Sequence, residues 1–276
     1  MRRKFQDQKS AQAFFLVNNL LMIQPFDDDI KKQTKSTTQE TNYTEIITMT
    51  PTLYHVPKTI SSPIVQILLE LGVKDNGIAV ETLTFKDLKT PAHIARNPMG
   101  TSPTFTDDDN DISIWESGAI LTYLLETYDT QHRFHPKHGT STPSERAKFL
   151  HLQQYIIATV YPFLASLYLH TLKPTNEQDQ DYVSSAKGKW RTLLAPTLVS
   201  FLKGQSYFMG NNVSAIDFLV AKPLNNAESL NLLEDFPELS AILTRIRCMP
   251  SFAIAYDVDA DKIDCHECRS FLLLPN

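Results

Sequence analysis

The earliest clear pattern of apolar residues consists of two short strand-like runs with a helical stripe between them. Leu53–Val56 is a short apolar run typical of a strand, and Ala79–Phe85 alternates apolar and polar side chains. Between them, residues 64–71 carry apolar side chains at helical spacing. Ser62, which a proline follows, is predicted to cap this helix, and Gly72 is predicted to end it. The chain is therefore predicted to open with a strand, a helix and a strand.

The next part of the pattern predicts a short helix and a hairpin. Pro91 favours the start of the helix, and Asn97, which a proline follows, favours its end. Thr104–Thr106 and Ile112–Trp115 are short strand-like runs. The charged residues 107–111 between them indicate the turn of a hairpin.

A longer helix completes the first domain. Glu116 and Ser117 open this helix, which carries apolar residues as far as Tyr128. The resulting order βαβαββα predicts a thioredoxin-like domain over residues 51–130. Residues 129–142 have no periodicity and are rich in turn-forming residues, so we expect a linker there.

Residues 142–258 are helical in pattern, and we expect an all-helical domain there. Two long stripes, Ser144–Leu172 and Asp181–Leu202, contain one proline each. Pro162 and Pro196 are predicted to kink or break these helices, because proline lacks an N–H donor and its ring collides with the preceding turn.

Two shorter helices follow, and a tail ends the chain. Ser214 precedes Asp217 by three residues, which predicts a reciprocal cap at the start of a helix. Pro237–Cys248 predicts another helix, and residues 259–276 are interpreted as a C-terminal tail.

Composition narrows the class of protein. A length of 276 residues allows one or two domains, and a net charge of −5 leaves no basic surface for nucleic acid. No apolar run reaches the roughly 18 residues of a membrane span, and we expect no membrane partner. We expect a cytoplasmic protein. Residues 1–50 contain a long polar stretch and are predicted to be a disordered extension, with a targeting segment as the alternative.

Cysteine and histidine positions do not predict a metal site. Three cysteines, Cys248, Cys265 and Cys268, argue against a disulfide framework and for a reducing compartment. The last two have C-x-x-C spacing, but no second pair of zinc ligands stands nearby. His132 and His135 lie in polar linker sequence and are expected to be solvated.

Two motifs in the first domain resemble the paired signature of cytosolic glutathione transferases: NPMGTSPTF at 97–105 and IWESGAILTYL at 114–124. The first is similar to the phi-class version, and the segment before the first helix is similar to both phi-class and beta-class members. Residues 214–224 and 236–252 resemble the cap and the late helix of the family's helical domain. The resemblance spans about 53–256. It implies glutathione as co-substrate, no metal, and a homodimer.

The resemblance assigns glutathione-binding roles to five residues. Pro103 is expected to be cis and to expose the backbone of Ser102, with which the peptide glutathione would pair. Glu116 and Ser117 open a helix, whose free N–H groups attract the γ-glutamyl carboxylate. Lys89 is expected to bind the glycyl carboxylate.

Two departures from the phi-like pattern affect the glycyl end of this site. Leu88 replaces a histidine that phi-class members often have, and Thr101 stands where a lysine or glutamine is common.

Four hydroxyl side chains are candidates for activating the glutathione thiol. A thiol must ionise to become a nucleophile, and a donor at the start of the first helix would lower its pKa. A phi-like alignment selects Thr59, and a beta-like alignment selects Ser61. Tyr54 and Ser62 are the other candidates. The segment has no cysteine, which argues against a thiol-reductase role.

We therefore expect a glutathione transferase that conjugates glutathione to small hydrophobic electrophiles. The electrophile would lie in a cleft against the helices around 144–172, with Phe149, Tyr155, Tyr161 and Phe163 as wall residues. One alternative is a non-catalytic interaction module of the same fold, since fold does not fix function. Another is a glutathione-dependent isomerase or peroxidase that uses the same site.

Overall fold

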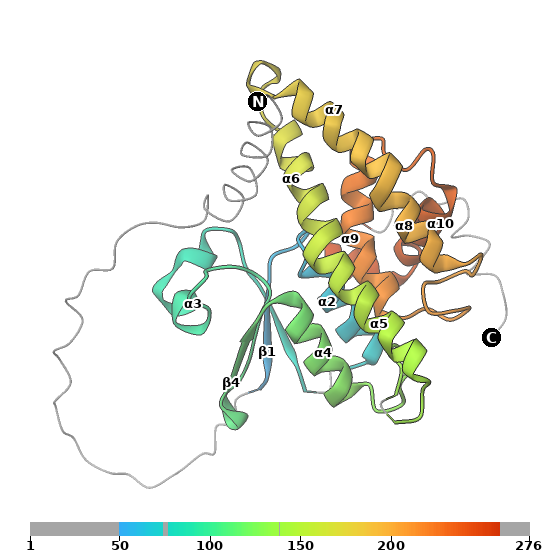
Figure 1. Cartoon of the computed structure of the whole chain (residues 1–276). Coiled ribbons are helices and arrows are strands. Elements are labelled where there is room, and N and C mark those ends of the chain that lie inside the picture. Colours follow the sequence, from blue (N-terminus) through green and yellow to red (C-terminus); the bar gives the residue numbers. More distant parts are fainter. Residues whose placement is uncertain (1–49, 74–76, 138, 260–276) are drawn as a thin grey trace, which may run out of the picture. The chain divides into compact units, whose positions relative to one another are not determined.

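The computed structural model describes residues 50–73, 77–137 and 139–259 (Figure 1). The first part of the chain alternates strands with helices: β1 (Thr52–His55), α2 (Ser62–Leu71), β2 (Ala79–Thr82), α3 (Pro91–Arg96), β3 (Thr104–Asp107), β4 (Ile112–Trp115) and α4 (Ser117–Tyr128). Two short 3-10 turns, Asp87–Lys89 and Asp108–Asn110, precede α3 and connect β3 to β4. This order confirms the predicted βαβαββα pattern.

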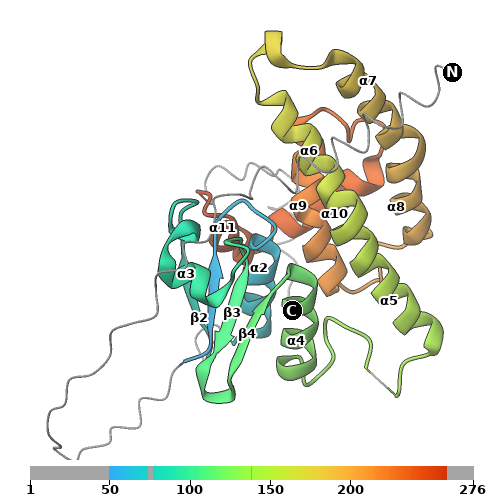
Figure 2. The same ribbon diagram turned by 60° about the vertical axis from the view of Figure 1, so that its left-hand side comes forward.

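The four strands form one mixed sheet in the order β2-β1-β3-β4. β1 is parallel to β2 and antiparallel to β3, and β3 is antiparallel to β4. Figure 2 shows α2 and α4 on the face of the sheet toward the helical region, with α3 on the other side. These features are those of a thioredoxin-like domain.

The residue that caps the first helix lies one position earlier in the chain than predicted. Ser61, not Ser62, is the N-cap residue of α2. The prediction was wrong because the Ser62 side chain accepts a hydrogen bond from the backbone N–H of Lys58 at 2.9 Å instead of capping the helix. The other end is as predicted: Gly72 has the left-handed φ of 73° that ends the helix.

The rest of the described chain is helical: α5 (Pro143–Tyr155), α6 (Tyr161–Thr171), α7 (Gln180–Lys189), α8 (Ala195–Leu202), α9 (Ala215–Ser229), α10 (Pro237–Arg247) and α11 (Pro250–Tyr256). Turns of π-helix, Ile156–Val160 and Trp190–Leu194, join α5 to α6 and α7 to α8. Each lies directly before the start of a helix with proline in its first turn. The wider π turn moves aside the carbonyl that the proline ring would otherwise meet.

The helical region packs on the sheet through α2. This helix contacts α9 and α11, and Gln66 of α2 donates from Nε2 to the Ser251 hydroxyl at 3.2 Å. α11 was not predicted. Ser214 and Asp217 form the predicted reciprocal cap at α9, with Ser214 N donating to Asp217 Oδ2 at 2.8 Å. No helix among the described residues has the length and apolarity to cross a membrane.

Two expectations about the linker and the cysteines are wrong. His135 is 7% exposed rather than solvated, because its Nδ1 bonds the buried Asp129 carboxylate at 2.8 Å. The same carboxylate accepts from the backbone N–H groups of Arg133 and Phe134, so it organises the linker. Cys248 is disulfide-bonded, which the low cysteine count did not predict. The C-x-x-C pair lies outside the described residues.

Candidate functional site

The predicted site residues gather at one end of the sheet because of strand register. Tyr54 pairs with Thr104, so the chain after β1 lies beside the chain before β3. Thr104 also pairs with Trp115, so the chain after β4 lies on the other side of the same segment. The loops that carry Thr59, Ser102 and Glu116 therefore leave the sheet at the same end.

Two buried polar side chains of the α3 region, Asn97 and His93, contact the backbone of the central loop, residues 98–103. Asn97 donates from Nδ2 to the Thr101 carbonyl at 3.1 Å and to the Thr104 hydroxyl at 3.0 Å. The ring of His93 contacts the same Thr101 carbonyl at 2.9 Å. Both side chains are at most 1% exposed. Sequence reasoning missed their role, although Asn97 stands inside the recognised motif.

The peptide bond between Ser102 and Pro103 is cis, as predicted. Among the described residues, neither the N–H nor the C=O of Ser102 makes a backbone hydrogen bond. The Ser102 hydroxyl accepts from the Val56 N–H at 3.0 Å, which ties this loop to the segment after β1. The free backbone groups of Ser102 can therefore pair with an extended peptide, as strand addition requires.

The start of α4 is suited to bind an anion. Ile120 N bonds the Glu116 carbonyl at 3.0 Å, and no described backbone acceptor takes the N–H groups of residues 117–119. Ser117 is 6% exposed, and Glu116 is exposed. Glu116 has φ 84° and ψ 114°, a backbone conformation that is rare for a residue with a side chain and typical of ligand sites. Free N–H groups at a helix start carry partial positive charge, which favours a carboxylate.

The two leading candidates for thiol activation differ in accessibility. Ser61 is fully buried, whereas Thr59 is partly exposed. The Thr59 hydroxyl donates to the Val56 carbonyl at 2.8 Å and lies 2.8 Å from the Ser61 hydroxyl. The other two candidates are poorly placed, since Tyr54 is 7% exposed and the Ser62 hydroxyl is bonded to the backbone of Lys58.

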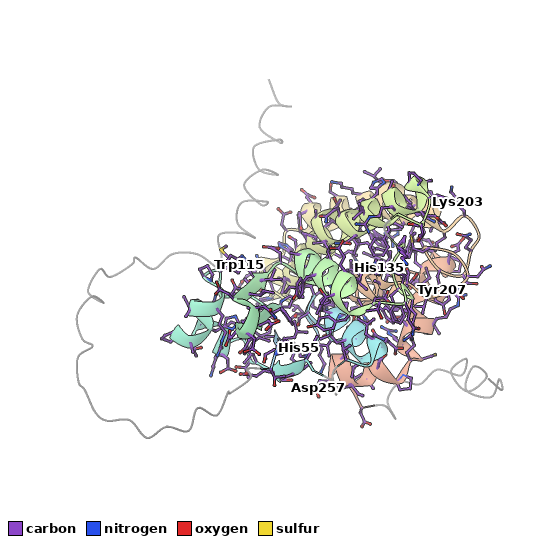
Figure 3. The ribbon with its side chains drawn as sticks, turned by 90° about the horizontal axis from the view of Figure 1, so that it is seen from below. His55, Trp115, His135, Lys203, Tyr207 and Asp257 are labelled. Atoms are coloured by element: carbon purple, nitrogen blue, oxygen red, sulfur yellow. The ribbon has the colours of Figure 1, made fainter. Side chains whose placement is uncertain are left out.

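His55, the last residue of β1, was missed by the sequence reasoning. It is 3% exposed, and its Nδ1 lies 2.9 Å from the Ser61 hydroxyl. Burial lowers the pKa of His55 to about 4, an effect that the nearby Asp257 carboxylate opposes. The ring is therefore neutral near pH 7. Figure 3 shows His55 and Asp257 on the same side of the molecule.

Lys89 lies beside the central loop. Its ammonium donates to the Gly100 carbonyl at 3.0 Å, two residues before Ser102. Gly100 has φ 56°, and a side chain there would come within 2.9 Å of the Leu88 carbonyl. The ammonium has three donors and is on an exposed residue, so it can bind a ligand carboxylate while it keeps this bond.

Of the four aromatic residues expected to line an electrophile cleft, one reaches the Thr59 segment. The Tyr161 hydroxyl interacts with the backbone of Ile60, and burial raises the pKa of this phenol. Phe149 is 3% exposed and belongs to the core, so its assignment as a wall residue is wrong. Tyr155 and Phe163 are partly buried against the core.

These features define a thioredoxin-like domain that has free backbone groups at Ser102, free N–H groups at the start of α4 and a partly exposed hydroxyl at Thr59. Residues 49–126 match the family model described as the N-terminal domain of glutathione S-transferase. Glutathione S-transferase D6 from Drosophila melanogaster is 29% identical over 173 residues, which are 61% of this chain and 74% of that protein.

Solved structures show the same fold. A glutathione transferase homolog from Lodderomyces elongisporus, with two glutathione molecules per subunit, aligns with a TM-score of 0.65 at 20% identity, covering 76% of this chain and 98% of that one. The glutathione transferase URE2P8 from Phanerochaete chrysosporium, with oxidized glutathione, has a TM-score of 0.64 at 19% identity, covering 82% and 98%. Residues 49–126 therefore resemble the N-terminal domain of glutathione S-transferases, and the described fold is that of the solved glutathione transferases.

No group of three metal-ligating side chains converges within residues 50–73, 77–137 and 139–259.

Proposed function

We propose that this protein binds glutathione at the end of the sheet and conjugates its thiol to small hydrophobic electrophiles. The observation that carries the proposal is the convergence of three features at that end. They are the unpaired backbone of Ser102, the free N–H groups at the start of α4, and the partly exposed Thr59 hydroxyl. The glutathione-containing relatives of the same fold support it.

Each feature matches a part of the tripeptide. The cysteinyl backbone of glutathione would pair with the N–H and C=O of Ser102, next to cis Pro103. The γ-glutamyl carboxylate would accept from the N–H groups at the start of α4 and from the Ser117 hydroxyl, and Glu116 would accept from the ligand ammonium. The ammonium of Lys89 would bind the glycyl carboxylate.

The chemistry requires a thiolate beside the start of α2. We assign the thiol contact to Thr59 rather than Ser61, because the Ser61 hydroxyl is fully buried and already surrounded by protein groups. The Thr59 O–H would turn from the Val56 carbonyl to the sulfur, and the thiol proton would leave to solvent. The thiolate would then attack the electrophilic carbon, forming a C–S bond and releasing the leaving group.

The direct test is turnover by the full-length chain with glutathione and three electrophile classes: an activated aryl halide, an α,β-unsaturated carbonyl compound and an organic hydroperoxide. Thioether formation that depends on Thr59 would support the transferase function. Reduction of the hydroperoxide alone would favour the peroxidase alternative. Glutathione binding without turnover of any class would contradict the catalytic proposal and favour a non-catalytic module.

The similarity to glutathione transferases also leads us to propose a cytoplasmic homodimer. Light scattering coupled to size exclusion tests the oligomeric state. A monomeric mass at micromolar concentration would contradict this part of the proposal.

A further inference from the structure

We infer that His55 is a positioning residue, which directs the Thr59 hydroxyl hydrogen toward the ligand thiol through the buried hydroxyl of Ser61. The inference rests on the proposed function and deepens it. It follows from the number of hydrogens and lone pairs available in one small cluster.

The cluster contains three side chains in series. His55 Nδ1 lies 2.9 Å from Ser61 Oγ, and Ser61 Oγ lies 2.8 Å from Thr59 Oγ1. The Val56 N–H donates to Ser61 Oγ at 3.2 Å, and the Ser61 N–H donates to Thr59 Oγ1 at 3.2 Å. Only Thr59 is partly exposed, so the series runs from the interior to the surface.

The position of the hydrogen on His55 decides where the other hydrogens point. A hydroxyl oxygen has one hydrogen and two lone pairs. If Nδ1 carries the hydrogen, His55 and the Val56 N–H fill both lone pairs of Ser61. Thr59 then cannot donate to Ser61, so its hydrogen turns to the Val56 carbonyl or to a ligand.

The tautomer that has no hydrogen on Nδ1 would let the Thr59 hydroxyl donate to Ser61 instead of to the ligand. If Nδ1 lacks the hydrogen, Ser61 donates to His55 and keeps one lone pair open. The Thr59 hydrogen can then point inward to Ser61, and a thiolate loses its donor. The Nδ1–H tautomer also provides more hydrogens for the short contacts around Ser61, including its 2.8 Å contact with the Val56 carbonyl.

The tautomer of His55 can direct the Thr59 hydrogen only while the imidazole is neutral and carries a single N–H hydrogen. Burial keeps the His55 imidazole neutral near pH 7, because the lowered pKa disfavours its protonated form. Among the described charged residues, Asp257 at the end of α11 is the group that acts on this ring. With Nδ1 as donor, the bonds run in one direction from His55 to Ser61 to Thr59 to sulfur whenever the single Ser61 hydrogen turns from the Val56 carbonyl to Thr59, and each bond then strengthens the next. No proton moves between heavy atoms in this chain.

The test compares two variants of nearly equal shape in the full-length chain. His55→Leu removes the donor, and His55→Asn restores a side-chain N–H near the Nδ1 position. The readout is the pKa of bound glutathione, from the ultraviolet absorbance of its thiolate against pH. S-methyl glutathione, which has no thiol, serves as the control for folding and for the rest of the site.

We expect His55→Leu to lower the thiolate fraction at pH 6.5 by about 2- to 5-fold, with S-methyl glutathione binding unchanged. His55→Asn should recover most of the loss. The double variant His55→Leu/Ser61→Ala should also recover most of the loss, because it removes the Ser61 lone pair to which the Thr59 hydrogen can turn.

Equal thiol pKa values in the wild type and in His55→Leu would overturn the inference and leave the proposed function intact. A wild type that fails to lower the thiol pKa would overturn the proposed function, and the inference with it. If His55→Leu fails to bind S-methyl glutathione, His55→Gln decides instead, since its amide reaches the Nε2 position and not Nδ1, and an unchanged thiol pKa in that variant would overturn the inference.

Discussion

Replacing Thr59 by valine removes one hydroxyl from the proposed thiol site and keeps the β-branched shape of the side chain. Thr59 is partly exposed and its hydroxyl makes 2.8 Å contacts with the Val56 carbonyl and the Ser61 hydroxyl. The structural cost should be modest, at about 1 kcal/mol, since neutral hydrogen bonds of this kind contribute about that much to stability. The larger effect should fall on the bound thiol.

The size of that effect follows from the energy of one charge-assisted hydrogen bond. Such a bond stabilises its anion by about 1.5–3 kcal/mol, which corresponds to about 1–2 pKa units. With a reference thiol pKa of about 8.5, the wild-type complex should titrate at about 6.5–7.5 and the Thr59→Val complex near 8.5. The thiolate fraction at pH 6.5 should then fall about 10- to 50-fold.

The assay is the conjugation rate at saturating glutathione, measured from pH 5.5 to 9.5. We expect the Thr59→Val profile to shift to higher pH and to approach the wild-type rate above pH 9. Thr59→Ser is the matched control, since it keeps the hydroxyl and should retain the wild-type midpoint. An unchanged midpoint in Thr59→Val would refute the assignment of Thr59 as the thiol donor.

Three further changes test the parts of the site separately. Lys89→Met should weaken glutathione binding several-fold and reduce its dependence on salt, because it removes a charge from the glycyl end; titration calorimetry at two salt concentrations measures both, and an unchanged Kd would contradict the assignment. Asn97→Ala should lower the free energy of unfolding by about 1–3 kcal/mol, because it removes one hydrogen-bond donor from the Thr101 carbonyl and one from the Thr104 hydroxyl. Asn97→Asp, which keeps the oxygen that accepts from Met99 but not the donor, is the control in urea unfolding, and equal stability of all three proteins would contradict the scaffold role. His55 has a folded pKa of about 4, below its ordinary 6.5, so the unfolded chain binds the proton more tightly. Its contribution to stability is therefore present above pH 6.5 and lost as the pH falls toward 4, amounting to about 3 kcal/mol; urea unfolding at pH 7 and pH 4 should show this loss in the wild type and not in His55→Asn.

Local signals in the sequence predicted most of the fold. Gly72 ends its helix in the left-handed conformation, as predicted. Pro162 and Pro196 lie next to the π-helical turns that interrupt the long helices. The N-cap of α2 was assigned to the wrong serine because Ser61 and Ser62 have the same side chain. The hydrogen bond from the Lys58 N–H to the Ser62 hydroxyl, which distinguishes them, forms only in the folded chain. α11 was missed because a helix of seven residues carries little periodic signal.

The site was predictable as far as its residues formed a recognisable motif. Pro103 stood in such a motif, and its cis bond was confirmed. His55 gave no signal of its own, because a histidine at a strand end has no fixed role. Its partner Ser61 becomes a neighbour only when the chain turns at the left-handed Lys58, which has φ 64°. The difference in burial between Ser61 and Thr59 likewise arises from tertiary packing, which the order of residues does not show.

The central claim is that the end of the sheet binds glutathione, and titration calorimetry of glutathione into the full-length chain tests it most directly. The matched variant is Glu116→Ala/Ser117→Ala, which changes the start of α4 and leaves the Thr59 segment intact. We predict one saturable binding event in the wild type and a Kd at least about 10-fold weaker in the double variant, because two charged or polar contacts are lost. No binding by the wild type, or equal affinity in both proteins, would contradict the proposed site.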